Sequence, residues 1–265
     1  MAIPALAPLF AGDFERYRNV LVLPGQDRRA GIPAIDLVSA EGLARLLSEY
    51  QKSHSGDDQR ALISLWSKHY FAKLIVPVAA ANLVVGHELP VALDQIEVIM
   101  GEGGFPEAFR LPHGGQPFQV SPGNPFERFR ELVDNNLSPL IDGWCDHIKI
   151  SRRVLWSNAA TYFERLIHTL ETSGVPHQTL ADGRQLIELD KRPNGHSNPM
   201  ASPVRYIERG EGCEPQRQRR HCCIRYRLPG LALCGNCPHI DRPPKGALVL
   251  SSSLPSLRTS ESTSS

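Results

Sequence analysis

The sequence lacks several features that would place it in a specialised class of protein. Its 29 Lys and Arg residues nearly balance 28 Asp and Glu residues, so the net charge of +1 argues against a nucleic-acid partner. Residues 1–11 contain no Lys or Arg, unlike a secretory signal peptide. The most apolar stretch, residues 74–85, is interrupted by Pro77 and Asn82 and is too short to span a bilayer. We therefore expect a cytoplasmic protein with no membrane-spanning segment.

The hydrophobic pattern predicts a helix-rich α+β fold. Residues 95–120 alternate apolar and polar side chains around glycine-rich turns, which predicts a β-hairpin or small sheet. We expect Pro77 to end or kink the helix that contains it, and residues 186–189 to form a short strand. Apolar side chains repeat at helical spacing in four stretches, which begin near Ser39, Leu62, Asn124 and Ser151.

Composition divides the chain into three parts. Residues 1–203 contain most of the predicted elements and are expected to form a scaffold that holds a ligand. Their last part, residues 191–203, is rich in proline and asparagine and has the composition of a linker. Residues 204–241 form a cysteine-containing module. The serine-rich residues 242–265 are expected to be a disordered tail.

Four of the six cysteines lie within sixteen residues, as Cys222-Cys223, ten further residues, and Cys234-x-x-Cys237. In a reducing compartment such thiols indicate a metal site or a catalytic group rather than disulfides. The second pair suits zinc, but adjacent side chains of an extended chain point to opposite faces, so Cys222 and Cys223 suit a wider cluster. A disulfide between them would be strained. The spacing favours an iron–sulfur cluster and leaves zinc and redox-active thiols open.

A resemblance to a known family narrows these alternatives. The C-terminal motif of the FhuF-like ferric siderophore reductases is similar to the run Arg219-x-x-Cys222-Cys223-x-Arg225-Tyr226 with Cys234-x-x-Cys237-Pro238. The family's R-x-L-W-x-N segment resembles Arg153-Val154-Leu155-Trp156-Ser157-Asn158, and Trp66-x-x-x-Tyr70 is also similar. The chain departs from the family in length, because residues 238–265 follow the last cysteine whereas family members tend to end soon after it.

The resemblance implies an oxidoreductase with a [2Fe–2S] cluster on Cys222, Cys223, Cys234 and Cys237. It implies one-electron reduction of Fe(III) in an imported siderophore, of the hydroxamate type, with release of Fe(II) in the cytoplasm. The partners would be the ferric siderophore, bound by residues 1–203, and an electron donor such as a ferredoxin or reductase. The alternative is a non-enzymatic module, stabilised by zinc or a cluster, that binds a siderophore or a partner protein.

The charge around the cysteines is locally positive. Seven arginines and three glutamates lie between residues 205 and 227. Guanidinium groups near an anionic cluster would stabilise it, and more so when it is reduced; a solvated basic loop is the alternative. We expect Cys145 to be a buried, inert thiol and Cys213 to be a spare thiol. The candidates for contact with substrate or partner are Arg219, Arg225, Tyr226 and Trp156. Asn158 is a further candidate for a wall that faces the substrate. The alternatives are core packing for Trp156 and a helix-surface amide for Asn158.

Overall fold

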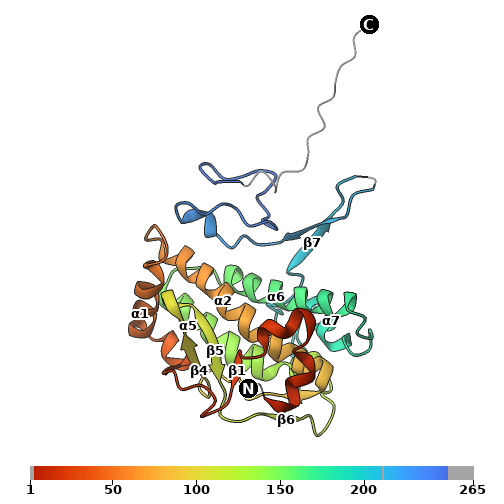
Figure 1. Cartoon of the computed structure of the whole chain (residues 1–265). Helices are drawn as coiled ribbons and strands as arrows, with labels where there is room; N and C mark the ends of the chain where they lie inside the picture. The colour runs from red at the N-terminus through yellow and green to blue at the C-terminus, as the bar shows by residue number, and fades with distance from the viewer. Residues whose placement is uncertain (1–2, 211, 250–265) are drawn as a thin grey trace.

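The computed structural model describes residues 3–210 and 212–249, and its architecture is α+β (Figure 1). The α-helices are α1 (Ala40–Gln51), α2 (Gln59–Ala80), α3 (Pro125–Arg128), α4 (Arg130–Leu132), α5 (Ser138–His147), α6 (Arg152–Thr172) and α7 (Ala181–Glu188). The strands are β1 (Leu21–Val22), β2 (Gly31–Pro33), β3 (His87–Glu88), β4 (Glu97–Met100), β5 (Pro106–Arg110), β6 (Gln116–Pro117), β7 (Val204–Ile207) and β8 (Gln216–Arg219). Short 3-10 or π segments are η1 (Pro4–Leu9), η2 (Gly12–Tyr17), η3 (Ala34–Val38), η4 (Ala81–Val85), η5 (Glu102–Gly104), η6 (Val133–Leu137) and η7 (Arg225–Arg227).

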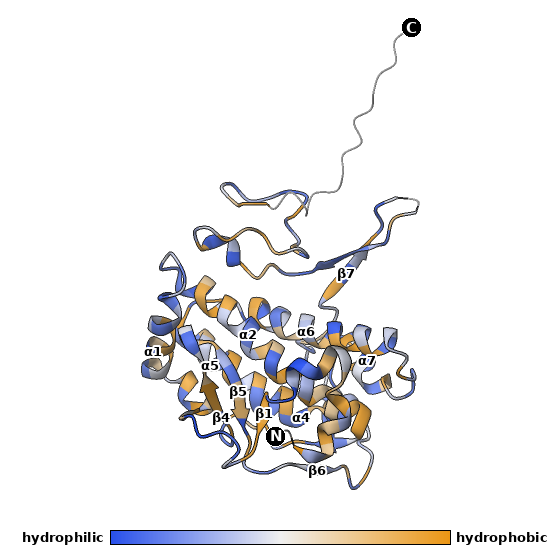
Figure 2. Cartoon of the chain, in the orientation of Figure 1, coloured by the Kyte–Doolittle hydropathy of each residue, from blue (hydrophilic) through white to orange (hydrophobic). Residues whose placement is uncertain are grey.

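Helices α2 and α6 lie side by side at the centre of the molecule. Nearly every turn of α2 is buried, although the helix carries hydrophilic as well as hydrophobic segments (Figure 2). Its first turn is capped by the Asp58 carboxylate, which accepts from the N–H groups of Arg60 and Ala61. Trp66 packs edge-on against Trp144 of α5, with ring centroids 5.6 Å apart. This core holds α2 and α6 in fixed positions, and the cysteine module lies on the surface that the two helices form.

The predicted end of the helix at Pro77 is wrong, because the helix ends three residues later. Helix α2 continues through Pro77 to Ala80, and the chain then widens into the π turn η4. The helix is terminated by Gly86, whose φ of 66° lies in the left-handed region that glycine adopts without strain. Burial on all sides of α2 outweighs the loss of one backbone hydrogen bond at the proline.

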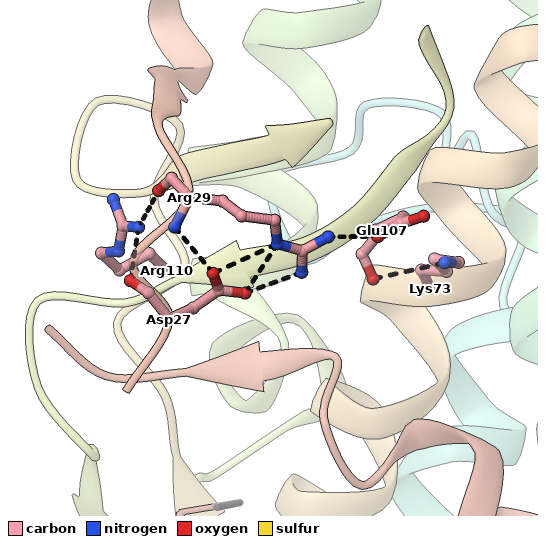
Figure 3. Close-up of polar contacts among 5 residues, drawn as sticks. All are labelled: Asp27, Arg29, Lys73, Glu107 and Arg110. Carbon is pink, nitrogen blue, oxygen red and sulfur yellow. Dashed lines mark hydrogen bonds and ion pairs between the residues drawn. The ribbon is translucent and has the colours of Figure 1, made fainter. Parts of the chain in front are cut away.

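The predicted hairpin is confirmed as β4 and β5, the centre of a four-stranded sheet of order β1-β5-β4-β2. Figure 3 shows the polar network that fixes this sheet to α2. Arg29 forms ion pairs with Asp27, at 2.7 Å, and with Glu107 on β5. Lys73 on α2 donates to the backbone carbonyl of Glu107 at 3.2 Å.

The predicted strand at residues 186–189 is wrong, because α7 extends to Glu188 and buries Leu186. Residues 191–203 are not a loose linker. The buried Asn198 side chain donates to the carbonyls of Leu186 and Leu189 at 2.6 and 2.7 Å, which folds the segment against α7. The run of residues 186–189 is too short for its period to decide between a helix and a strand, which is why the predicted strand is wrong.

The cysteine module begins with the antiparallel hairpin β7–β8 and lies over α2 and α6 (Figure 1). It has a small core of its own, formed by the cysteines with Leu233. Ala247 and Val249 also pack against this core, and Leu233 N–H donates to the Leu248 carbonyl at 2.8 Å. The module therefore includes residues beyond 241, while the rest of the predicted tail, residues 250–265, lies outside the described part of the chain.

Candidate metal centre

A sharp turn directs both adjacent cysteines to one place. Ile224, directly after Cys223, has a φ of 51°, in the left-handed region that a β-branched residue rarely adopts. The Ile224 N–H donates to the Cys222 sulfur at 3.3 Å. Cys222 and Cys223 pack in one small core with Cys234 and Cys237, so their side chains do not point apart as they would in an extended chain. Strain at a β-branched residue is typical of a functional site that the surrounding structure holds in place.

The four sulfurs meet in two pairs. Cys222 Sγ lies 3.8 Å from Cys237 Sγ, and Cys223 Sγ lies 3.9 Å from Cys234 Sγ. Two thiolates on one tetrahedral metal, each about 2.3 Å from it, are about 3.8 Å apart. Within residues 3–210 and 212–249, no three His, Cys, Asp or Glu side chains form a group suited to a single metal ion. Each of these two distances is therefore short enough for both sulfurs to bind one iron of a dinuclear cluster, with one cysteine from each half of the motif in each pair.

Contacts among the four thiols lower the pKa of Cys223 and Cys237 and raise the pKa of Cys222 and Cys234. Hydrogen bonds from the thiols of Cys222 and Cys234 lower the pKa of Cys223 and lower that of Cys237 to about 3, against the effect of burial. The charges of Lys68 and Arg219 lower the pKa of Cys223 further. His239 N–H also approaches Cys237 Sγ at 3.5 Å. Such contacts to sulfur are among those by which a protein adjusts the potential of a bound cluster.

A buried polar network joins this site to α2 and α6. Ser64 on α2 donates to the Cys223 carbonyl at 2.7 Å. Asn158 on α6 is fully buried, and its amide donates to the Ser64 carbonyl at 2.9 Å and to Ser67 Oγ at 3.0 Å. The same amide accepts, through Oδ1, a 2.5 Å hydrogen bond from Arg219. Polar groups buried in this way need partners, so the network fixes the module in one position on the helices.

Ion pairs at the edge of the module hold it in the same position. Glu164 on α6 is 7% exposed and pairs with Arg217 of β8. It also accepts a 2.8 Å hydrogen bond from the Tyr206 hydroxyl of β7. On the other side, Arg227 reaches Asp58, the N-cap of α2, at 2.7 Å. The module is thus fixed by carboxylates at both ends and by neutral polar groups in the middle.

The structure separates the predicted contact residues into two sets. Arg219 and Trp156 are 2% and 8% exposed, so they lie inside the molecule, beneath the module. Arg225 and Tyr226 lie half-buried on η7. The Tyr226 ring packs edge-on against His239, with centroids 6.4 Å apart.

The remaining cysteines lie outside the group of four sulfurs. Cys145 on α5 is half-buried, and burial raises its pKa to about 11, which matches the inert thiol expected from the sequence. Cys213 is exposed in the loop after β7. His221, next to Cys222, is exposed, and its carbonyl accepts a 3.4 Å hydrogen bond from Ser157.

Sequence reasoning missed the residues beneath the cluster site. Ser64 and Ser67 lie three residues apart on α2, a spacing that indicates one polar helix face. Asn158 is 0% exposed, so it is neither a wall that faces the substrate nor a surface amide. Lys68 carries no local signal, because only the fold brings α2 next to Cys223.

Comparison with solved structures concerns the fold alone. ATP-bound aerobactin synthetase IucA from a hypervirulent pathotype of Klebsiella pneumoniae matches with a TM-score of 0.50 and 13% identity, over 68% of this chain and 38% of that chain. A second structure of aerobactin synthetase IucA from the same source matches with a TM-score of 0.51, over 64% of this chain and 37% of that one. At this identity the match indicates a shared architecture. None of the helices in the described residues is both long and apolar enough for a membrane span.

Sequence comparison identifies relatives. The ferric siderophore reductase of Escherichia coli (strain K12) is 26% identical over 181 residues, which cover 68% of this chain and 66%, just under two thirds, of the relative. The model of the family described as ferric iron reductase FhuF-like transporter matches residues 64–213. The model of the FhuF 2Fe-2S C-terminal domain matches residues 219–239, which contain the two pairs of sulfurs. With more than half of its length matched, the chain belongs to the FhuF-like family, and its C-terminal module is the [2Fe–2S] domain of that family.

Proposed function

We propose that the protein is a ferric siderophore reductase whose [2Fe–2S] cluster is held by Cys222, Cys223, Cys234 and Cys237. The observation that carries this proposal is the pairing of the four sulfurs at 3.8 and 3.9 Å on a module fixed to α2 and α6. The name of the Escherichia coli relative supports the class of substrate.

The chemistry requires one electron and no proton. A siderophore holds Fe(III) through hard oxygen donors, and reduction to Fe(II) lowers the charge of the ion and its affinity for those donors. The bound cluster supplies one electron at a time and regains it from an external donor, such as a ferredoxin or reductase. The protein's part is to hold the chelate near the sulfurs. Arg220 and Arg225, on the outer side of the module, suit an acidic donor.

The proposed place for the chelate is a cavity of about 440 Å³ between η2, α2 and α6. Its lining includes Arg16, Lys73 and Arg165 together with Tyr17 and Tyr162. Arginine and lysine side chains can donate hydrogen bonds to the oxygen donors of a ferric chelate, and aromatic rings can pack against its organic framework. Tyr162, which lines the cavity, lies on α6 one turn after Asn158, the residue that accepts a hydrogen bond from Arg219 of the module. The cavity between α1 and the Gly101–Gly104 segment is larger, but its lining includes no residue of α6 or the module.

A single-turnover titration under anaerobic conditions tests the function. The protein is reduced with dithionite, freed of excess reductant, and mixed with ferric siderophores of the hydroxamate and catecholate types. We expect the visible spectrum of the oxidised cluster to return with one Fe(II) released per chain, and to return fastest with a hydroxamate. Unchanged spectra with every chelate, together with tight chelate binding, would instead support the non-enzymatic binding module. Cell fractionation tests the cytoplasmic location.

The location of the chelate is tested separately. Arg165→Glu reverses a charge that lines the cavity, whereas Arg130→Glu makes the same change at an exposed residue of α4. We expect Arg165→Glu to weaken chelate binding about tenfold, in keeping with the loss of a charge-assisted contact, and Arg130→Glu to leave it unchanged. Equal effects of the two variants would place the chelate elsewhere, without bearing on electron transfer itself.

A further inference from the structure

Arg219 is a buried cation without a carboxylate partner. Its side chain is among the largest that are fully enclosed, at 2% exposure. Its guanidinium donates to Asn158 Oδ1 at 2.5 Å and to Ser157 Oγ at 3.2 Å, and both acceptors are neutral. Its Nε has no hydrogen-bond partner. No Asp or Glu in the described part of the chain forms an ion pair with it.

Most other arginines of the module are paired with a carboxylate or exposed, although the half-buried Arg225 likewise forms no ion pair within the described residues and its Nε has no hydrogen-bond partner. Arg209, Arg217 and Arg227 each pair with a carboxylate, from Asp241, Glu164 and Asp58 respectively. Arg220, the neighbour of Arg219 in sequence, is exposed to solvent. A buried charge with no partner costs several kcal/mol, so a cation at this position requires a negative charge close by.

The cysteines provide that negative charge. The Arg219 N–H donates to the Asn236 carbonyl at 2.8 Å, inside the Cys234-x-x-Cys237 loop. The guanidinium is linked to Cys223 through two side chains, because Asn158, which accepts from Arg219, donates to Ser64, and Ser64 donates to the carbonyl of Cys223. Cys223 is 1% exposed. Arg219 is thus placed at the inner side of the sulfur group, where water does not screen its charge.

We infer that Arg219 is the internal counter-ion of the cluster and sets its reduction potential. Reduction adds one negative charge to a group that is already anionic, and a fixed cation in a low-dielectric site stabilises the reduced form more than the oxidised form. The inference rests on the cluster and not on siderophore reduction, because the potential is a property of the protein alone.

The acceptors of Arg219 explain how its charge stays available. An amide and a hydroxyl bind the guanidinium without cancelling its charge, whereas a carboxylate would cancel it. The Asn158 amide is oriented by its donation to Ser64 and Ser67, so its oxygen faces Arg219. Asn158 is therefore a positioning residue, and Asn158→Asp would neutralise Arg219 while keeping an acceptor in the same place.

Anaerobic redox titration of the full chain, followed by visible absorbance without any siderophore, tests the inference. We expect Arg219→Gln to lower the midpoint potential by at least 59 mV, which is tenfold in a one-electron equilibrium. Arg219→Lys keeps the charge, so we expect it to change the one-electron equilibrium constant by less than about threefold. The control Arg220→Gln removes the same charge from the surface. We expect it to change the one-electron equilibrium constant by less than about twofold, and this effect should disappear at high salt.

Equal shifts for Arg219→Gln and Arg220→Gln would overturn the inference. If Arg219→Gln does not retain its cluster, the test rests on Arg219→Lys and Asn158→Asp. An unchanged midpoint potential in Asn158→Asp contradicts the role of Arg219. A midpoint potential lower by 59 mV or more, which is tenfold in the one-electron equilibrium, supports it. A protein that shows these shifts but does not oxidise with ferric siderophores would refute the proposed function and leave the counter-ion in place.

Discussion

Glu164 is the contact whose loss should detach the cysteine module from the helices. It lies on α6 and is 7% exposed, and it accepts from Arg217 of β8 and from the Tyr206 hydroxyl of β7. Glu164→Gln keeps the shape of the side chain and the acceptor for Tyr206 but removes the charge that pairs with Arg217. Arg217 keeps its second hydrogen bond, to the Thr161 carbonyl at 3.1 Å. The change therefore leaves a half-buried cation without its counter-charge.

The exposure of the pair sets the size of the effect. Removing one partner of a fully buried pair costs about 3–5 kcal/mol. The Arg217 side chain is 20% exposed, so water can solvate part of its charge. We expect a loss of about 2–3 kcal/mol, just below that range. For a chain of this size such a loss lowers the midpoint of thermal unfolding by roughly 5–10 °C if the whole protein unfolds together.

Two signals followed in one anaerobic heating experiment distinguish detachment from general unfolding. The visible absorbance reports the cluster, and far-ultraviolet circular dichroism reports the helices. The control is Glu171→Gln on the same helix, which breaks the 2.6 Å pair with Arg184 of α7 and touches no residue of the module. We expect Glu164→Gln to lose its visible signal at a lower temperature than its helices. If both variants lose the two signals together and by equal amounts, Glu164 does not hold the module.

Three further predictions concern individual residues. Cys234→Ser should lose iron and acid-labile sulfide, measured per chain, while Cys213→Ser should retain both because Cys213 is exposed outside the sulfur group. Ser64→Ala removes the 2.7 Å bond to the Cys223 carbonyl and should destabilise the protein by about 1–3 kcal/mol in chemical denaturation without changing the visible spectrum. Burial lowers the pKa of His69 from 6.5 to about 4, so the unfolded chain binds more protons between these values and stability should fall as the pH falls through this window. His69→Phe should reduce that fall, measured as denaturation midpoints at about pH 5 and about pH 7.5.

The elements that could be predicted from the sequence are those with a long period or a cap. Helix α1 begins behind Ser39, whose hydroxyl accepts from the Gly42 N–H, and α3 begins behind Asn124 with Pro125 in its first turn. The α6 boundaries also match, at Ser151 and before Gly174. These signals are local, so no knowledge of the fold is needed to use them.

The elements that could not be predicted depend on contacts far apart in sequence. The strands β7 and β8 together contain three arginines, two glutamines and few apolar residues. Each strand pairs with the other, and Arg217 of β8 also pairs with Glu164 of α6. The turn at Ile224 is not visible either, because its left-handed conformation is unusual for a β-branched residue. Both features exist because the module is held on the helices, which a local pattern does not describe.

The same dependence explains why Trp156 and Asn158 looked like candidates for substrate contact. A tryptophan beside a polar residue in an R-x-L-W-x-N segment suits a binding surface when the helix is considered alone. In the fold, that surface of α6 is covered by the module, and Asn158 is occupied by Arg219 at 2.5 Å. A carboxylate at position 158 would hold Arg219 more strongly but would cancel its charge. An amide is therefore the side chain that both fixes the module and leaves the cation free to act on the cluster.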